Sequence, residues 1–273
     1  MNEKKLFLGV LLTPWFIVLT LALALAFTSC DGNKPSDPGQ LNVEEYVGTS
    51  WYLDSIDMGS YVSTHMCMPI FITSKNTIQL GNEVQEFEVK DGVLTINYRY
   101  DGESVGSERH FTLVSVSKTT GAVLKEGEHT VYVSAIPTLD RNKQSAISEA
   151  ALIGKYKQVI SSIEETAVDG SKTISYSTGG LIFWINLKAD HKMVYENSNP
   201  YMDNTQGYWD VKPAERLITW GGVSSYSELI SMNHWENIIV FNEDYLVTGE
   251  DYDYDGTMGF THRHYESVLL RVK

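Results

Sequence analysis

The sequence predicts an all-β protein that contains two small antiparallel β-barrels in tandem. Turn residues recur about every 8–12 positions from Tyr46 onward, which is typical of a chain of short hairpins. Apolar and polar residues alternate in segments such as Phe87-Glu88-Val89, as a half-buried antiparallel strand requires. Helical periodicity is nearly absent, and Glu149–Ile153 is expected to form no more than one short turn.

The third observation is an internal repeat that divides the chain into two similar halves. Tyr46–Trp51 is similar to Leu152–Tyr156, because each has a glycine followed closely by an aromatic residue. Gln85–Lys90 is similar to Gln206–Lys212, and in both halves a turn and another apolar strand follow. Hairpins in units of about 100 residues must hide their strand edges, by barrel closure or in a sandwich, and we expect barrels.

The first thirty residues have the order of an export signal. Lys4 and Lys5 form a short positive start, and the apolar run Leu6–Phe27 leads to Thr28-Ser29-Cys30. This ending resembles a lipobox, which implies cleavage before Cys30 and attachment of lipid to that cysteine. An uncleaved membrane anchor is the alternative, because the run is long enough to span a bilayer. Either way, the remainder is expected on the outer side of the inner membrane.

Composition shifts mark the expected domain boundaries. Residues 1–29 form the lipoprotein signal peptide, and residues 30–43 form a flexible tether that lacks large apolar side chains in its first part. Residues 44–137 form the first β domain and residues 149–273 the second. Residues 138–148 are polar, interrupt the β pattern and are expected to be an exposed linker.

The order of these features resembles the lipocalin-like domains of lipoproteins from Gram-negative envelopes. The resemblance rests on an opening glycine–aromatic motif, a strand that ends in a polar turn, an aromatic strand and a late turn: Gly48–Trp51 and Gly154–Tyr156, Phe71–Leu80 and Phe183–Tyr195, Phe87 and Trp209, and Asn242–Leu246. It implies small up-and-down barrels, each with a calyx. It also implies a lipid-anchored protein of the outer membrane, at its periplasmic face or at the cell surface, but no activity.

Charge and motifs exclude several classes of function. The formal net charge is -14, and no cluster of lysine and arginine follows the signal, so nucleic-acid binding is not expected. Serine-hydrolase, metalloprotease and phosphate-loop motifs are missing, so we expect a protein without enzymatic activity and without a cofactor. The only two cysteines are Cys30 and Cys67, so lipidation of Cys30 leaves no intrachain disulfide.

Two short segments are candidates for metal binding. Asp251-Tyr252-Asp253-Tyr254-Asp255-Gly256 resembles the first half of a Ca²⁺ loop, with Asp251, Asp253 and Asp255 as ligands. The alternative is a solvated hairpin tip, since no glutamate completes the loop. His262 and His264 lie two apart on an expected strand, but zinc requires a third ligand, and two surface histidines are the simpler interpretation.

Aromatic residues are dense in the second domain and suggest where a ligand would bind. Core packing and cross-strand pairs are the simple interpretation of these rings. The functional interpretation is a ligand site near Tyr201, Trp209 and Trp235, beside the polar loop Asn197–Asn204. We therefore expect a binding lipoprotein for a small apolar or amphipathic ligand or a partner. The alternatives are a glycan-binding module of a surface nutrient-capture system and a structural accessory whose barrels are filled by side chains.

Overall fold

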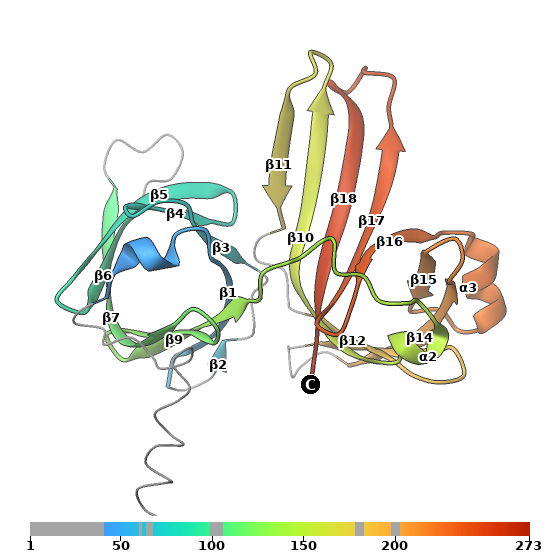
Figure 1. Ribbon diagram of the computed structural model, residues 1–273, viewed down its shortest axis with the longest axis horizontal. Coiled ribbons are helices and arrows are strands. Elements are labelled where there is room, and N and C mark those ends of the chain that lie inside the picture. The colour runs from blue at the N-terminus through green and yellow to red at the C-terminus, as the bar shows by residue number, and fades with distance from the viewer. Residues whose placement is uncertain (1–40, 60–61, 64–67, 99–105, 178–182, 198–202) are drawn as a thin grey trace, which may run out of the picture.

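The computed structural model describes residues 41–59, 62–63, 68–98, 106–177, 183–197 and 203–273, which form two closed antiparallel eight-stranded β-barrels (Figure 1). The predicted fold class is thereby confirmed. Cys30, Cys67 and the predicted signal peptide lie outside the described residues. Within the described ranges, no helix has the length and apolarity needed to cross a membrane.

The first barrel closes by pairing its first strand with its last. Its elements are η2 (Val43–Tyr46), β1 (Ser50–Asp57), β2 (Val62–Ser63), β3 (Pro69–Ile72), β4 (Thr77–Leu80), β5 (Glu83–Lys90), β6 (Val93–Tyr98), β7 (Ser107–Ser117), β8 (Gly121–Glu126) and β9 (His129–Ile136). β1 pairs with β9 on one side, and on the other side with β3 and then with the short β2. In Figure 1, η2 lies within the ring of strands, and its Tyr46 is buried in the barrel core.

The second barrel repeats this topology. Its elements are α2 (Glu149–Leu152), β10 (Gly154–Ala167), β11 (Lys172–Tyr176), β12 (Phe183–Leu187), β13 (Lys192–Asn197), β14 (Thr205–Lys212), β15 (Leu217–Gly221), α3 (Tyr226–Met232), β16 (Glu236–Phe241), β17 (Tyr245–Asp253) and β18 (Phe260–Arg271). β10 closes the barrel against β18 and also pairs with β12 and β11.

β-Bulges fall at matching positions in the two barrels. They allow the two barrels to be aligned residue by residue. The pairing of β1 with β9 shifts register after Leu53, and the pairing of β10 with β18 shifts after Gln158. Trp51 and Tyr156 each lie two residues before this β-bulge, so they are equivalent. Since bulges set the local bend of a strand, their shared position confirms that the two halves are copies of one β unit.

One predicted turn has the backbone that its residues favour. Asp91 and Gly92 connect β5 to β6, and both have positive φ, of 52° and 75°. Aspartate and glycine tolerate this left-handed conformation, and a two-residue loop of this kind matches the twist of the flanking strands.

The two helices next to the second barrel have capped N-termini. The short turn expected at Glu149–Ile153 is α2, whose cap Ser148 accepts a hydrogen bond from the Ala151 amide at 3.1 Å. α3 was not expected from periodicity. Its signal is the pair Ser225 and Glu228, because the Ser225 hydroxyl accepts from the Glu228 amide at 3.2 Å.

The segment between the barrels is exposed but tied to the second barrel. The Ser145 amide donates to the Phe241 carbonyl at 2.7 Å, and Gln144 Oε1 accepts from Arg216 Nη2 at 2.9 Å. Tyr52 and Ile136 of the first barrel join a buried cluster with residues of β10, β16, β17 and β18. The segment is therefore exposed, as its polar composition predicts, but it is not a free linker.

Candidate functional site

The interior of the first barrel holds an apolar cavity. Its volume is about 160 Å³, and its lining comes from η2, the segment before it and the barrel strands. Apart from Arg109, every lining residue is aliphatic or aromatic. An engineered apolar cavity of about 150 Å³ accepts benzene or xenon, so this space suits a ligand about the size of one ring.

One lining side chain offers an unused hydrogen-bond donor. Trp51 is 8% exposed, and within the described chain its buried Nε1 has no hydrogen-bond partner. Its ring packs edge-on against Tyr46, with ring centroids 5.9 Å apart. A buried donor left without an acceptor costs about 1–3 kcal/mol. An acceptor on a bound molecule would remove that cost.

Arg109 is the single charged residue of the lining. It forms an ion pair with Glu126, whose pKa is lowered mainly by the hydrogen bond from Arg109. The guanidinium carbon lies 5.6 Å from the Tyr98 ring centroid and 5.2 Å from that of Phe111. Arg109 is half-exposed, so it presents its charge at the rim while its stem covers the apolar interior.

Larger side chains occupy part of the interior of the second barrel at positions that border the cavity of the first. Phe87, Ile96 and Ala122 of the first barrel are equivalent in register to Trp209, Trp220 and Leu246 of the second. Each residue of the second barrel is the larger of its pair. The side chains of Tyr156, Trp209 and Leu246 are fully buried, whereas Trp51 keeps a small accessible surface. The difference in side-chain volume explains the cavity.

Two of the three residues predicted to bind a ligand, Trp209 and Trp235, lie in different surroundings. Trp209 is fully buried, and its Nε1 donates to the Lys188 carbonyl at 2.8 Å. Trp235 precedes β16 and lies under the Lys212 ammonium, 4.1 Å from the ring centroid. Tyr201 lies outside the described residues. Core packing, the simple interpretation of these rings, accounts for Trp209, and the ligand site of the second domain stays a prediction.

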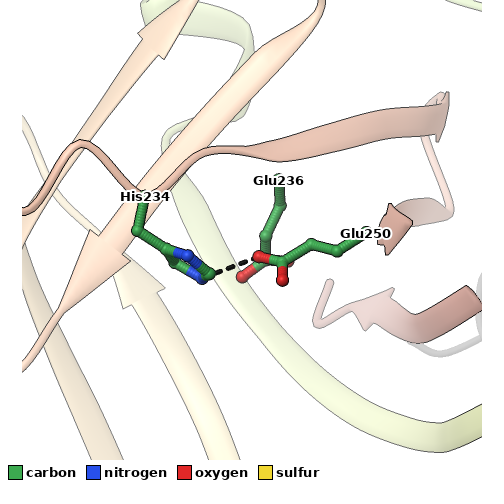
Figure 2. Close-up of side chains that lie close together, drawn as sticks. All are labelled: His234, Glu236 and Glu250. Atoms are coloured by element: carbon green, nitrogen blue, oxygen red, sulfur yellow. Dashed lines mark ion pairs between the residues drawn. The ribbon is translucent and has the colours of Figure 1, made fainter. Parts of the chain in front are cut away.

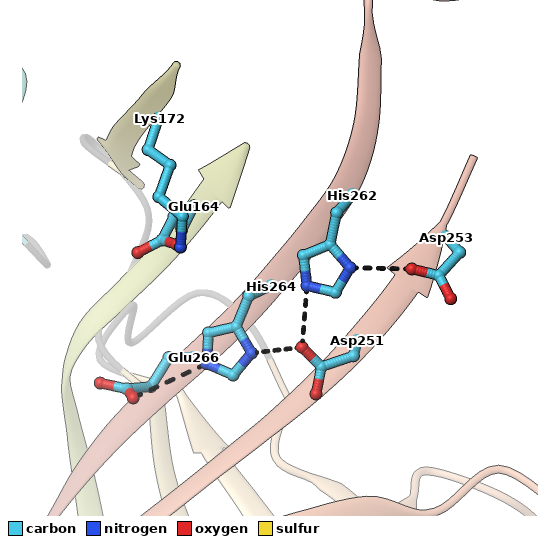
Figure 3. Close-up of polar contacts among 7 residues, drawn as sticks. All are labelled: Glu164, Lys172, Asp251, Asp253, His262, His264 and Glu266. Atoms are coloured by element: carbon cyan, nitrogen blue, oxygen red, sulfur yellow. Dashed lines mark hydrogen bonds and ion pairs between the residues drawn. The ribbon is translucent and has the colours of Figure 1, made fainter. Parts of the chain in front are cut away.

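The acidic hairpin tip places its carboxylates against histidines (Figure 3). Asp251 Oδ1 lies 3.1 Å from His262 Nε2 and 2.9 Å from His264 Nδ1, and Asp253 Oδ1 lies 3.0 Å from His262 Nδ1. Asp255 instead accepts hydrogen bonds from the amide and hydroxyl of Thr257. Asp251 and Asp253 thus share His262, whereas Asp255 bonds to Thr257, so the three carboxylates do not converge on one point, and the Ca²⁺ site stays a prediction.

A group that the sequence did not single out can hold a metal ion. His234, Glu236 and Glu250 each offer one ligand atom, and these atoms all lie within 4.8 Å of one another (Figure 2). His234 and Glu236 are two residues apart at the start of β16, and Glu250 comes from the adjacent β17. The only local signal was the His-x-Glu spacing, since the strand pairing that brings Glu250 beside it is a tertiary feature.

The fold and these sites define a tandem β-barrel protein whose first barrel holds an apolar cavity and whose second barrel carries a polar pocket. No family model and no curated protein matches the sequence. A solved structure of a protein of unknown function from the DUF3598 family of Nostoc punctiforme is similar over 85% of this chain and 100% of that chain, with 9% identity and a TM-score of 0.23. A likeness at this score is not evidence about function.

Proposed function

We propose that this chain is a lipid-anchored binding protein of the cell envelope whose first barrel holds a small apolar molecule with a hydrogen-bond acceptor. The observation that carries this proposal is the apolar cavity of about 160 Å³, whose lining includes Trp51 with its buried, unpartnered Nε1. Binding sites for small molecules are mostly apolar, with a few polar groups that fix orientation. Trp51 supplies such a group inside, and Arg109 supplies one at the rim.

The lining favours an apolar ligand over a sugar. Burying sugar hydroxyls without partners is costly, and a lining of aliphatic and aromatic residues supplies few hydrogen bonds. The glycan-binding alternative would therefore need another surface of the molecule. A structural role without ligand would leave the Trp51 donor unsatisfied without compensation.

Two probe molecules of nearly identical shape test the role of Trp51. Acetophenone carries a carbonyl acceptor, and α-methylstyrene replaces that oxygen by a methylene group. We expect calorimetric titration of the mature chain to show acetophenone binding several-fold more tightly, since one buried hydrogen bond contributes about 0.5–1.5 kcal/mol. Trp51→Phe should remove this preference while both probes still bind.

Trp235→Phe is the matched control, because it makes the same change in the second domain. It should leave both affinities unchanged. Loss of binding in Trp235→Phe but not in Trp51→Phe would move the site to the second domain. Binding of neither probe by the unaltered chain would contradict an accessible cavity and favour the structural alternative.

The envelope anchor is inferred from the residue order that ends at Cys30. Mass spectrometry of the protein from its native membrane should find an N-terminal Cys30 with added acyl mass. Cys30→Ala should leave the precursor uncut and without acyl mass. A native N-terminus at Met1 without lipid would overturn the anchor and favour an uncleaved membrane helix, without touching the barrel cavity.

A further inference from the structure

The rims of the two barrels differ at one equivalent place. Counting from the matching bulges after Leu113 and Ile238, His234 corresponds to Arg109, and Glu250 corresponds to Glu126. The first barrel therefore balances one carboxylate with a permanently charged guanidinium. The second barrel has His234 at the place of Arg109. Glu236 adds a second carboxylate where the first barrel has the apolar Phe111.

The second carboxylate is poorly solvated. Glu236 is half-buried, and its carboxylate oxygen lies within 4.8 Å of a carboxylate oxygen of Glu250. Two carboxylates in a partly buried site repel each other, and one imidazole offsets at most one of them. A bound cation would supply the missing positive charge.

Tyr252 fixes the orientation of Glu250. Its hydroxyl donates a hydrogen bond to Glu250 Oε2, and this bond is the main cause that raises the pKa of Tyr252 to about 12. The other oxygen, Oε1, faces His234 Nε2 at 2.7 Å as an ion pair (Figure 2). Metal sites commonly have such a partner that holds a ligating carboxylate in place.

Polar atoms of the same pocket are enclosed. Glu250 Oε1 is buried beside His234, and the buried Thr248 hydroxyl interacts with the Glu236 carboxylate. Thr248 is 0% exposed. With His234 and Glu236, both residues line a pocket of about 330 Å³. An imidazole and two carboxylates that converge on the wall of a space of this size form a ligand set for a cation.

We propose that this pocket binds a divalent transition-metal ion of the zinc class through His234 Nε2 and one carboxylate oxygen each of Glu236 and Glu250. Zinc accepts nitrogen and oxygen ligands in this combination, whereas Ca²⁺ and Mg²⁺ prefer oxygen alone. Three protein ligands leave a coordination position for water or for a small molecule in the pocket. This site is separate from the apolar cavity of the first barrel.

The test is calorimetric titration of the chelator-treated mature chain with Zn²⁺. We expect one ion per chain, and an affinity at least about tenfold lower in His234→Gln and in Glu250→Gln. His234 is exposed, so its replacement should not impair folding, and circular dichroism verifies this. Ca²⁺ in place of Zn²⁺ should bind far more weakly.

Two control variants locate the ion. Glu126→Gln makes the equivalent change in the first barrel, and His262→Gln alters the separate histidine–aspartate group of the hairpin tip. Both should retain Zn²⁺ binding and the accompanying rise in melting temperature. Unchanged affinity in His234→Gln and Glu250→Gln, loss of the ion in His262→Gln, or no Zn²⁺ bound by the unaltered chain would each overturn the proposal.

Discussion

Ala122 and Leu246 occupy equivalent positions of the two barrels, yet one borders a cavity and the other is fully packed. Ile96, which also borders the cavity, is equivalent to the larger Trp220. Barrel interiors are close-packed, so a few missing carbon atoms in the lining remain as empty space. At the scale of single residues, side-chain volume decides which barrel can admit a ligand.

Ala122→Leu should close the cavity of the first barrel. It copies the second barrel, and the added side chain should fill part of the space of about 160 Å³. We expect a gain of about 0.5–2 kcal/mol in the free energy of unfolding, together with loss of acetophenone binding. Thermal unfolding measures the first and calorimetry the second. Ala150→Leu adds the same atoms at an exposed position and should change neither; full binding in Ala122→Leu would place the ligand elsewhere.

His262 makes stability depend on pH. Its hydrogen bond with Asp253 is the largest cause that raises the pKa of the imidazole, and the charge of Asp251 adds to it. Because the folded pKa lies above the unfolded value of about 6.5, the stabilisation is complete at lower pH and disappears as pH rises through the folded pKa. The melting temperature of the unaltered chain should exceed that of His262→Gln at about pH 5.5 and equal it at about pH 9. A difference that grows with pH would contradict this charge pairing.

Strands of the second barrel approach closely where glycines meet. A Cβ atom on Gly207 would lie 2.0 Å from the Gly221 carbonyl oxygen, whereas a Cβ atom on Gly221 would meet the flexible side chain of Leu229 at 3.4 Å. Gly221 pairs with Tyr208, the residue after Gly207, across β14 and β15, but only Gly207 is required by sterics. The constraint belongs to the pair of strands, because neither strand alone contains the clash.

Gly207→Ala should therefore destabilise the second barrel by about 3 kcal/mol, since the new methyl group forces β14 away from β15. Gly221→Ala, the neighbouring control, should cost less than about 1 kcal/mol. Chemical denaturation of both variants gives the comparison. Equal and small losses would show that the backbone relaxes at this place.

The two barrels share apolar contacts and an ion pair. Lys157 of β10 pairs with Asp54 of β1, and its ammonium lies 4.7 Å from the Tyr52 ring centroid. Segment 138–148 packs on the second barrel, where Ile147 contacts the core and Gln144 bonds to β16 and to Arg216 just before β15. At the scale of the molecule, this segment is part of the second folding unit.

Two fragments test this division. Residues 138–273 keep the connecting segment and should fold with a cooperative melt. Residues 149–273 lose its hydrogen bonds and the packing of Ile147, and should melt about 5–10 °C lower. Equal melting temperatures would make the segment a mere spacer. Aggregation of both fragments would mean that the second barrel depends on the first.

The order of neighbouring residues in the sequence sufficed to predict the strands, the turns and the repeat. Examples are the alternation at Phe87–Val89, the left-handed turn at Asp91-Gly92 and the glycine–aromatic openings. The capped helix α3 has a local signal in Ser225 and Glu228, but this one pair is weak beside the surrounding β pattern. The prediction that aromatic density locates the ligand did not point to Trp51, because density does not distinguish a filled interior from a hollow one.

Which barrel is hollow was decided by tertiary structure alone. The free volume inside a barrel depends on side chains from all eight strands. Only the strand register shows that Phe87, Ile96 and Ala122 are equivalent to larger residues of the second barrel. The group of His234, Glu236 and Glu250 likewise depends on the strand register. Strand pairing and a β-bulge place Glu250 beside residues far from it in the chain, and burial between strands then gives the site its charge imbalance.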